Sequence, residues 1–156
     1  MAESLHYKEL LQALNESHVE FLIVGGYAVM KYTEPRYTKD LDIWVNRSPE
    51  NSANVFQALA RFGAPLSKDG ITPETFTEES LIYQIGVPPV RIDILTQVTG
   101  VEFEEAWPNR VGSTIFGVPV HFISLSDLIA NKQLSGRDSD LDHLKPIQEQ
   151  QSGRKD

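Results

Sequence analysis

The 156 residues include 14 basic and 22 acidic side chains, for a net charge of −8, and 40% of them are hydrophobic. This balance predicts one globular domain and argues against a long basic groove for nucleic acid, though not against a pocket for a single triphosphate. The lack of cysteine excludes disulfides, thiolate zinc sites and cysteine nucleophiles. Because no leader-like segment or membrane-length apolar run is seen, we expect a cytoplasmic protein without a membrane partner.

Helices and strands alternate through the first 62 residues. The run at 21–24 (FLIV) is apolar throughout, as in a strand buried on both faces, and Gly25 and Gly26 end it. Ser48 has the side chain of a helix N-cap, with Pro49 at the first helical position. In chain order the patterns predict a helix over 3–17, a strand over 21–24, a helix over 27–32, a strand over 41–45 and a helix over 49–62.

The second half is expected to contain more strands. Residues 64–80 contain Pro65, Gly70 and Pro73 and are expected to be irregular. The patterns then predict strands over 81–86 and 90–95, one or two helical turns over 103–107, a hairpin of 111–116 and 118–123, and helices over 124–134 and from 138 or 139 to 145. The whole is a mixed α/β (α+β) domain over residues 1–147, with a mixed sheet flanked by helices, and a polar tail over 148–156.

Three aspartates are expected on strand faces. Residues two apart share a face of a strand, so Asp40, Asp42 and Trp44 point to one side, with the two carboxylates about 7 Å apart at their Cα atoms. Asp93 lies in another apolar strand and joins them if the two strands are neighbours. Such carboxylates repel one another unless a divalent cation joins them, and three can hold two magnesium ions for in-line phosphoryl displacement. The alternatives are a solvated strand face for the first pair and a surface ion pair with Arg91 for Asp93.

Gly25 and Gly26 stand between a predicted strand and a predicted helix. Backbone N–H groups at such a place can approach a phosphate without obstruction by a Cβ atom, and the start of a helix favours anions. The alternative is a plain turn between strand and helix. Later in the chain, the acidic stretch 102–105 is expected to be a solvated helix face, and Tyr32 and Trp44 are each expected to pack at the sheet surface rather than to stack on a base.

The combination of these motifs resembles the DNA polymerase β-like nucleotidyltransferase superfamily. The resemblance rests on Gly25-Gly26, Asp40-x-Asp42 and Asp93. It is closest to small bacterial members related to the AbiEii-type toxins, which carry GGYA followed by R-x-T-x-D-L-D. Here these stretches read Gly25-Gly26-Tyr27-Ala28 and Arg36-Tyr37-Thr38-Lys39-Asp40-Leu41-Asp42, and Lys132 with Gly136-Arg137-Asp138-Ser139-Asp140 extends the similarity over residues 20–147.

The resemblance implies roles for individual residues. It implies that Asp40, Asp42 and Asp93 are catalytic and bind magnesium, with manganese as the alternative ion. For the nucleotide, it implies that the two glycines hold the β- and γ-phosphates and that the remaining contacts come from Arg36, Thr38, Lys132, Arg137 and Asp140. The chain departs from the family in having Gly26 where many members have serine, and Ser139 and His143 where a basic and an acidic residue are common. From the residues alone, Lys132 can also be a lysine whose stem covers apolar surface, and Arg36 a surface partner of Glu34.

The activity implied by the resemblance is transfer of an NMP from an NTP to an acceptor hydroxyl, with release of pyrophosphate. The acceptor is a protein, a tRNA or a small molecule; the toxin-like members favour the first two, and the negative charge argues mildly against tRNA. A second copy or a partner protein would complete the acceptor side. The alternatives are a catalytically faded NTP-binding module and a scaffold of the toxin–antitoxin kind, because a fold alone does not decide function.

Overall fold

The structure is a computed structural model that describes residues 2–33, 40–87 and 90–135. The predicted last helix and tail lie outside these ranges, as do Arg36, Thr38, Arg137 and Asp140. The helices are α1 (Ala2–Glu16), α2 (Gly25–Tyr32), α3 (Pro49–Phe62), α4 (Phe103–Ala106) and α5 (Leu125–Ser135), with 3-10 turns at Thr75–Thr77 and Trp107–Asn109. The strands are β1 (Phe21–Val24), β2 (Asp40–Val45), β3 (Ile82–Val87), β4 (Val90–Leu95), β5 (Val111–Ile115) and β6 (Val118–Phe122).

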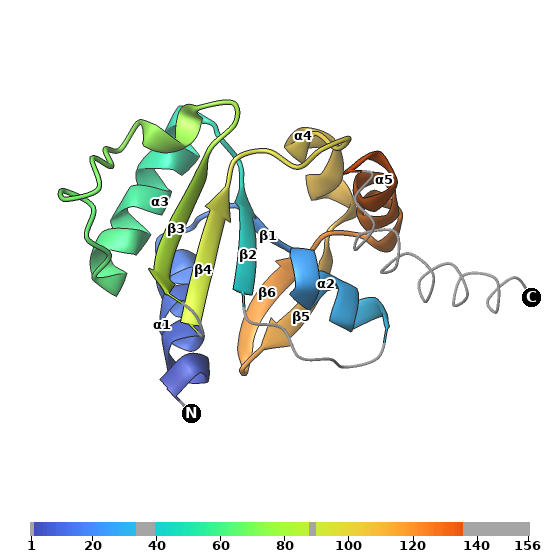
Figure 1. Ribbon diagram of the computed structural model, residues 1–156, viewed down its shortest axis with the longest axis horizontal. Coiled ribbons are helices and arrows are strands. Elements are labelled where there is room, and N and C mark those ends of the chain that lie inside the picture. Colours follow the sequence, from blue (N-terminus) through green and yellow to red (C-terminus); the bar gives the residue numbers. More distant parts are fainter. Residues whose placement is uncertain (1, 34–39, 88–89, 136–156) are drawn as a thin grey trace, which may run out of the picture.

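The six strands form one mixed sheet in the order β3-β4-β2-β1-β6-β5 (Figure 1). β2 is parallel to β4 and β1 is parallel to β6, whereas the other neighbours are antiparallel. Helices α1 and α3 pack against each other on the left of the sheet in Figure 1, and α2 lies on the right, in contact with β1 and β2. The mixed α/β architecture expected from the sequence is therefore confirmed.

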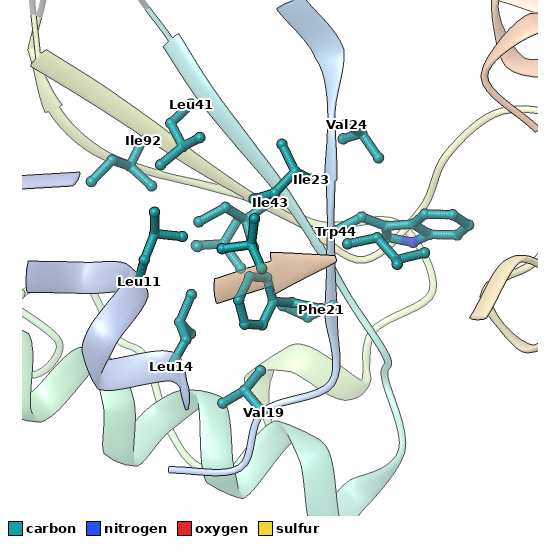
Figure 2. Close-up of a cluster of buried hydrophobic side chains, with 14 of the residues drawn as sticks. Leu11, Leu14, Val19, Phe21, Ile23, Val24, Leu41, Ile43, Trp44 and Ile92 are labelled. Carbon is teal, nitrogen blue, oxygen red and sulfur yellow. The ribbon is translucent and has the colours of Figure 1, made fainter. Parts of the chain in front are cut away.

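The core lies where the apolar face of the central strands meets α1. Leu41 and Ile43 of β2 and Ile92 of β4 are buried, and Figure 2 shows them on the side of Leu11 and Leu14. Burying each of these side chains stabilises the fold by about 1.5–3 kcal/mol. This packing fixes which face of β2 and β4 turns away from the core, and the alternating polar residues occupy that second face.

Two helix starts and one stop follow the expected capping chemistry. The Ser48 hydroxyl accepts a hydrogen bond from the backbone N–H of Asn51 at 3.2 Å, and α3 ends at Gly63, whose φ of 96° suits glycine. Ser124 accepts from the N–H of Asp127 at 3.2 Å at the start of α5. The prediction for α2 was wrong by two residues: the helix begins at Gly25 rather than Tyr27, because Gly25 takes a φ of 68° and turns the chain directly from β1 into the helix.

The prediction for residues 64–80 was too simple, because a 3-10 turn at Thr75–Thr77 interrupts the irregular segment. Ser52 of α3 holds it: its hydroxyl donates to the carbonyl of Pro73 at 2.7 Å and accepts from the N–H of Phe76 at 3.0 Å. Within the described ranges, no helix combines the length and the apolar character needed to cross a membrane.

Candidate functional site

Two parallel strands bring the predicted acids together. Asp42 of β2 is the register partner of Asp93 of β4, and Asp40 is the partner of Arg91. Neighbouring strands lie about 4.8 Å apart, so these side chains form one compact patch on the face turned away from α1. The sequence argument for a shared strand face, and its condition that the two strands be neighbours, both hold in the structure.

Gly25 closes one side of this patch. β1 runs antiparallel to β2 and pairs Val24 with Asp42, so the residue after Val24 lies directly beside that carboxylate. A Cβ atom added at Gly25 would collide with Oδ2 of Asp42, and the φ of 68° is itself costly for other residues. Both the backbone conformation and the available space therefore require glycine here, at the start of a helix whose N–H groups favour anions.

Arg91 is the main counter-charge of the three acids. Its guanidinium lies 2.9 Å from Asp40 Oδ2, donates a hydrogen bond from Nη2 to Asp93 Oδ2 at 3.3 Å, and places Nε 3.2 Å from Asp93 Oδ1. The last pair of atoms is close but misaligned, so Arg91 Nε and Asp93 Oδ1 are buried without a hydrogen bond. A buried acceptor without a donor is costly, which marks Asp93 Oδ1 as able to take a further ligand.

Asp42 and Asp93 have perturbed acidities. Burial, followed by the charges of Asp93 and Asp40, raises the pKa of Asp42 to about 7, while Lys132 and Arg91 oppose the shift. Burial also raises the pKa of Asp93 above its usual value, against the opposing effect of Arg91. The two carboxyl groups are within hydrogen-bonding reach of each other. Strong perturbation by burial together with specific charges in a cleft is typical of functional sites.

The patch forms the floor of a cleft of about 690 Å³, which we call the nucleotide cleft. Lys132 of α5 reaches it with only 7% of its surface exposed. Asn131 of the same helix donates a hydrogen bond to the carbonyl of Thr99 at 3.0 Å and so ties α5 to the loop that follows β4. The cleft is lined by Val24, Gly25, Asp40, Asp42, Ile82, Gln84, Arg91, Asp93, Leu95, Gln97, Val98, Thr99, Asn131, Lys132 and Leu134.

The structure thus brings together five of the predicted site residues: Gly25, Asp40, Asp42, Asp93 and Lys132. Gly26 follows in α2 but does not line the cleft. Within the described ranges, no three carboxylate or histidine side chains are arranged as a ready metal site, and Asp40 and Asp93 are both paired with Arg91. The sequence predicted Arg91 only as a partner of Asp93, whereas in the structure it pairs with both Asp93 and Asp40. Two signals point to this: Arg91 alternates with Asp93 along β4, and it lies opposite Asp40 in the register of β2 and β4.

The aromatic residues weighed for base stacking have packing roles. Trp44 packs edge-on against Phe103 with ring centroids 5.1 Å apart, and it is 1% exposed. The Tyr32 hydroxyl donates to the carbonyl of Ile123 at 2.8 Å. The preference for packing over stacking is confirmed for both residues.

Comparisons with solved structures agree with this architecture. A structure from Thermotoga maritima described as a nucleotidyltransferase is 12% identical and aligns over 95% of this chain and 91% of its own, with a TM-score of 0.54. ANT(2")-Ia, solved in complex with adenylyl-2"-tobramycin, is 17% identical over 95% of this chain and 87% of its own, with a TM-score of 0.57. An antigenic nucleotidyltransferase-like protein from Paracoccidioides brasiliensis is 17% identical over 94% of this chain and 72% of its own, with a TM-score of 0.50.

At these identities the likeness shows the fold, which is the polymerase β-like nucleotidyltransferase fold with its mixed sheet and flanking helices. No curated protein matches the sequence. A family model does, over residues 3–155. The chain therefore belongs to the family described as nucleotidyl transferase of unknown function (DUF2204).

Proposed function

We propose that this protein transfers an NMP from an NTP to an acceptor hydroxyl and releases pyrophosphate, with magnesium bound by Asp40, Asp42 and Asp93. The observation that carries the proposal is the pairing of Asp42 with Asp93 on adjacent parallel strands, directly beside Gly25 at the start of α2. This arrangement places buried carboxylates next to backbone donors suited to phosphate. The fold and the family described above support the same reaction class.

The residues present suit a divalent cation. All the candidate donors are hard carboxylate oxygens, one of them, Asp93 Oδ1, is buried without a hydrogen bond, and Asp42 holds a proton more firmly than an ordinary aspartate. Asp40 and Asp42 would hold two ions and Asp93 one of them, once Arg91 turns from the carboxylates to the triphosphate. Bound magnesium supplies positive charge that stabilises the attacking and leaving oxygens.

The protein's own groups bind the nucleotide and manage the proton. The backbone N–H group at Gly25 and the ammonium of Lys132 would hold the phosphates, and by resemblance Gly26, Arg36, Thr38, Arg137 and Asp140 add contacts. The acceptor oxygen forms a bond to the α-phosphorus, the bond from that phosphorus to the β-phosphate oxygen breaks, and pyrophosphate leaves. Asp93, whose pKa is raised by burial, takes the proton of the acceptor hydroxyl.

The resemblance to AbiEii-type members favours a protein or tRNA as acceptor. ANT(2")-Ia, in contrast, was solved with a small-molecule product, adenylyl-2"-tobramycin. A faded NTP-binding module or a partner-binding scaffold of the toxin–antitoxin kind is disfavoured, because all three aspartates are present and burial and the neighbouring acids oppose the charge of Asp42, which has no purpose in a scaffold. A location in the cytoplasm and a partner subunit on the acceptor side belong to the same proposal.

Thermal unfolding with each of the four NTPs, with and without magnesium, tests the proposal. For the wild type we expect a magnesium-dependent rise in stability with at least one NTP, about 2.7 kcal/mol when the ligand is at ~100 times its Kd. Asp42→Ala should lose the rise, and each protein is compared with its own ligand-free sample because the substitution also removes a buried acid. The lack of a shift with every NTP in the wild type would contradict the proposed function.

A further inference from the structure

A second cavity lies at the carboxyl end of β2, beside the nucleotide cleft. Its volume is about 630 Å³, within the range of small-molecule sites in proteins and too small for a folded partner. It is bounded by the end of β2, the loop after β4 and α4, and its lining residues include Trp44, Arg47, Glu79, Gln97, Glu102 and Phe103. We call it the acidic cavity.

The acidic cavity adjoins the nucleotide cleft. Gln97 and Val98 line both spaces. Trp44 lies two residues beyond Asp42 on the same face of β2, about 7 Å along the strand, and it pairs in register with Leu95, two residues beyond Asp93. A molecule bound in this cavity would therefore have to reach past Gln97 and Val98 to bring its hydroxyl to Asp93, the carboxylate that takes the acceptor proton.

The charges of the acidic cavity favour a cation. Four glutamates line it, Glu79, Glu102, Glu104 and Glu105, against the single positive charge of Arg47. The Arg47 guanidinium donates a hydrogen bond to the carbonyl of Thr77 at 3.2 Å. Within the described ranges, none of the four glutamates forms an ion pair with a basic side chain. Their negative potential is thus available to a bound ligand.

Aromatic groups and an unsatisfied donor complete the acidic cavity. Trp44 and Phe103 line it, but they are 1% and 8% exposed and pack edge-on against each other, with Phe103 stacked on Trp107, so they form an apolar floor. The Nε1–H of Trp44 is buried in this floor and has no hydrogen-bond partner. A ligand oxygen that reaches the edge of the indole would satisfy this donor and remove the cost of leaving it unpaired.

The wall between the two spaces is held in place. Thr96 forms two hydrogen bonds with Leu81, next to β3. The N–H of Thr96 donates to the carbonyl of Leu81 at 3.0 Å, and the Thr96 hydroxyl accepts from the N–H of Leu81 at 2.8 Å. The turn that follows contacts α5, because Gly100 lies against Leu134 and the carbonyl of Thr99 accepts from Asn131. The acidic cavity therefore exists before a ligand arrives, which lowers the entropy cost of binding.

We infer that the acidic cavity is the acceptor site and that it takes a small molecule carrying ammonium groups beside its reactive hydroxyl. This inference rests on the proposed function and narrows it, because it selects a cationic small molecule over a protein or a tRNA. A phosphate-rich tRNA would be repelled by the four glutamates, and the hydroxyl side chain that a protein could insert into a space of this size carries no positive charge to pair with them.

A pair of matched sugars tests the inference by calorimetric titration of the full chain. A trimer of glucosamine carries three ammonium groups, and its fully N-acetylated counterpart has the same ring hydroxyls but no charge. We expect the amine trimer to bind at least about tenfold more tightly, with an affinity that falls as salt is raised. Equal binding of the two trimers, or no binding of either, would overturn the inference.

Charge-neutralising variants locate the binding. Glu102→Gln with Glu105→Gln should weaken binding of the amine trimer about tenfold. The control double variant, Glu9→Gln with Glu74→Gln, removes the same charge from exposed positions that do not line the acidic cavity, and should change binding by less than about twofold. An equal loss in both double variants would show attraction by net charge alone and would overturn the assignment.

The magnesium-dependent NTP shift is measured on the same samples. If the wild type shows that shift but no preference for the amine trimer, only the acceptor inference fails. If the NTP shift is also lacking, the proposed function fails first. If the amine trimer stimulates pyrophosphate release, and Glu102→Gln with Glu105→Gln reduces this stimulation, the result would support both the proposed function and the acceptor inference.

Discussion

The nucleotide cleft and the acidic cavity share Gln97 and Val98 but hold their charges in different ways. In the nucleotide cleft the acids stand on strands and are partly buried, and Arg91 and Lys132 compensate them within the fold. In the acidic cavity the glutamates are exposed and have no basic partner among the described residues. Buried charges require fixed partners, whereas exposed charges are compensated by water and remain available to a ligand. The first space therefore suits a metal–triphosphate, and the second an ammonium-bearing molecule.

The largest expected effect is the loss of reaction rate in Asp93→Asn, a change in the nucleotide cleft that should leave binding in the acidic cavity intact. Asp93→Asn keeps the size of the side chain but removes the charge and the proton acceptor, so the rate of pyrophosphate release should fall roughly 10²- to 10⁴-fold. The rate is measured with the amine trimer as acceptor. Binding of the trimer itself, followed by calorimetry, should be unchanged. Loss of trimer binding together with the rate would show that the two spaces are one site.

The next effect concerns the pH dependence of stability without metal. The pKa of Asp42 is raised from 3.8 to about 7 in the folded protein, so between these values the folded state binds more protons than the unfolded state. Stability must then fall as pH rises through this window, and Asp42→Asn should remove the part of the fall that Asp42 contributes, leaving a smaller fall from Asp93, and stabilise the protein above the window by up to about 4 kcal/mol. Urea unfolding in the presence of a chelator at both ends of the window measures the difference.

The acidic cavity supplies the control for that experiment. Glu102 is exposed, so Glu102→Gln should change the free energy of unfolding by less than about 0.5 kcal/mol at either pH. A similar gain from both substitutions would mean that general repulsion among the acids of this protein, rather than burial at the nucleotide cleft, determines its pH response.

The smallest expected effect is the difference in stability loss between alanine substitutions at two glycines with similar backbone angles. Gly25 and Gly70 have φ of 68° and 70°, but an added Cβ collides with Asp42 at the first and meets nothing within 4 Å at the second. Gly70→Ala should cost about 1–2 kcal/mol of stability from its backbone alone. Gly25→Ala should cost about 1 kcal/mol more through the collision and should also abolish the magnesium-dependent NTP shift, which Gly70→Ala should retain.

Thermal and urea unfolding measure both substitutions, with the NTP shift as the second readout. Equal stability losses and an intact NTP shift in Gly25→Ala would show that the close approach to Asp42 has no part in nucleotide binding.

Much of the nucleotide cleft follows from local sequence. The alternation in β2 and β4 fixes the faces of Asp42 and Asp93, because a shift of one residue would turn Ile43 and Ile92 out of the core. The capping chemistry of Ser48 likewise predicts the start of α3. These features depend on contacts between near neighbours or on a single buried face, which a sequence pattern reports directly.

Other features depend on pairings between distant segments. The position of β4 beside β2, and with it the double ion pair of Arg91, follows from packing of the whole sheet. The acidic cavity arises where the end of β2 meets the loop after β4, so the sequence identifies 102–105 only as a solvated face. Local rules also misplace the start of α2, because they treat Gly25 as a break, whereas its φ of 68° continues the chain into the helix.

The ion pairs of Arg91 have a consequence for the order in which ligands arrive. The guanidinium of Arg91 is held beside Asp93 of its own strand and Asp40 of the neighbouring strand at a very high effective concentration, so a free divalent ion competes poorly for these oxygens. Under the proposed function, a triphosphate would change the competition, because it would offer Arg91 another anionic partner while it delivers the metal. The side chain would then act as a tethered competitor that a metal–nucleotide complex displaces more readily than the metal alone. Loading of the protein should accordingly be ordered, with the nucleotide and its metal entering together.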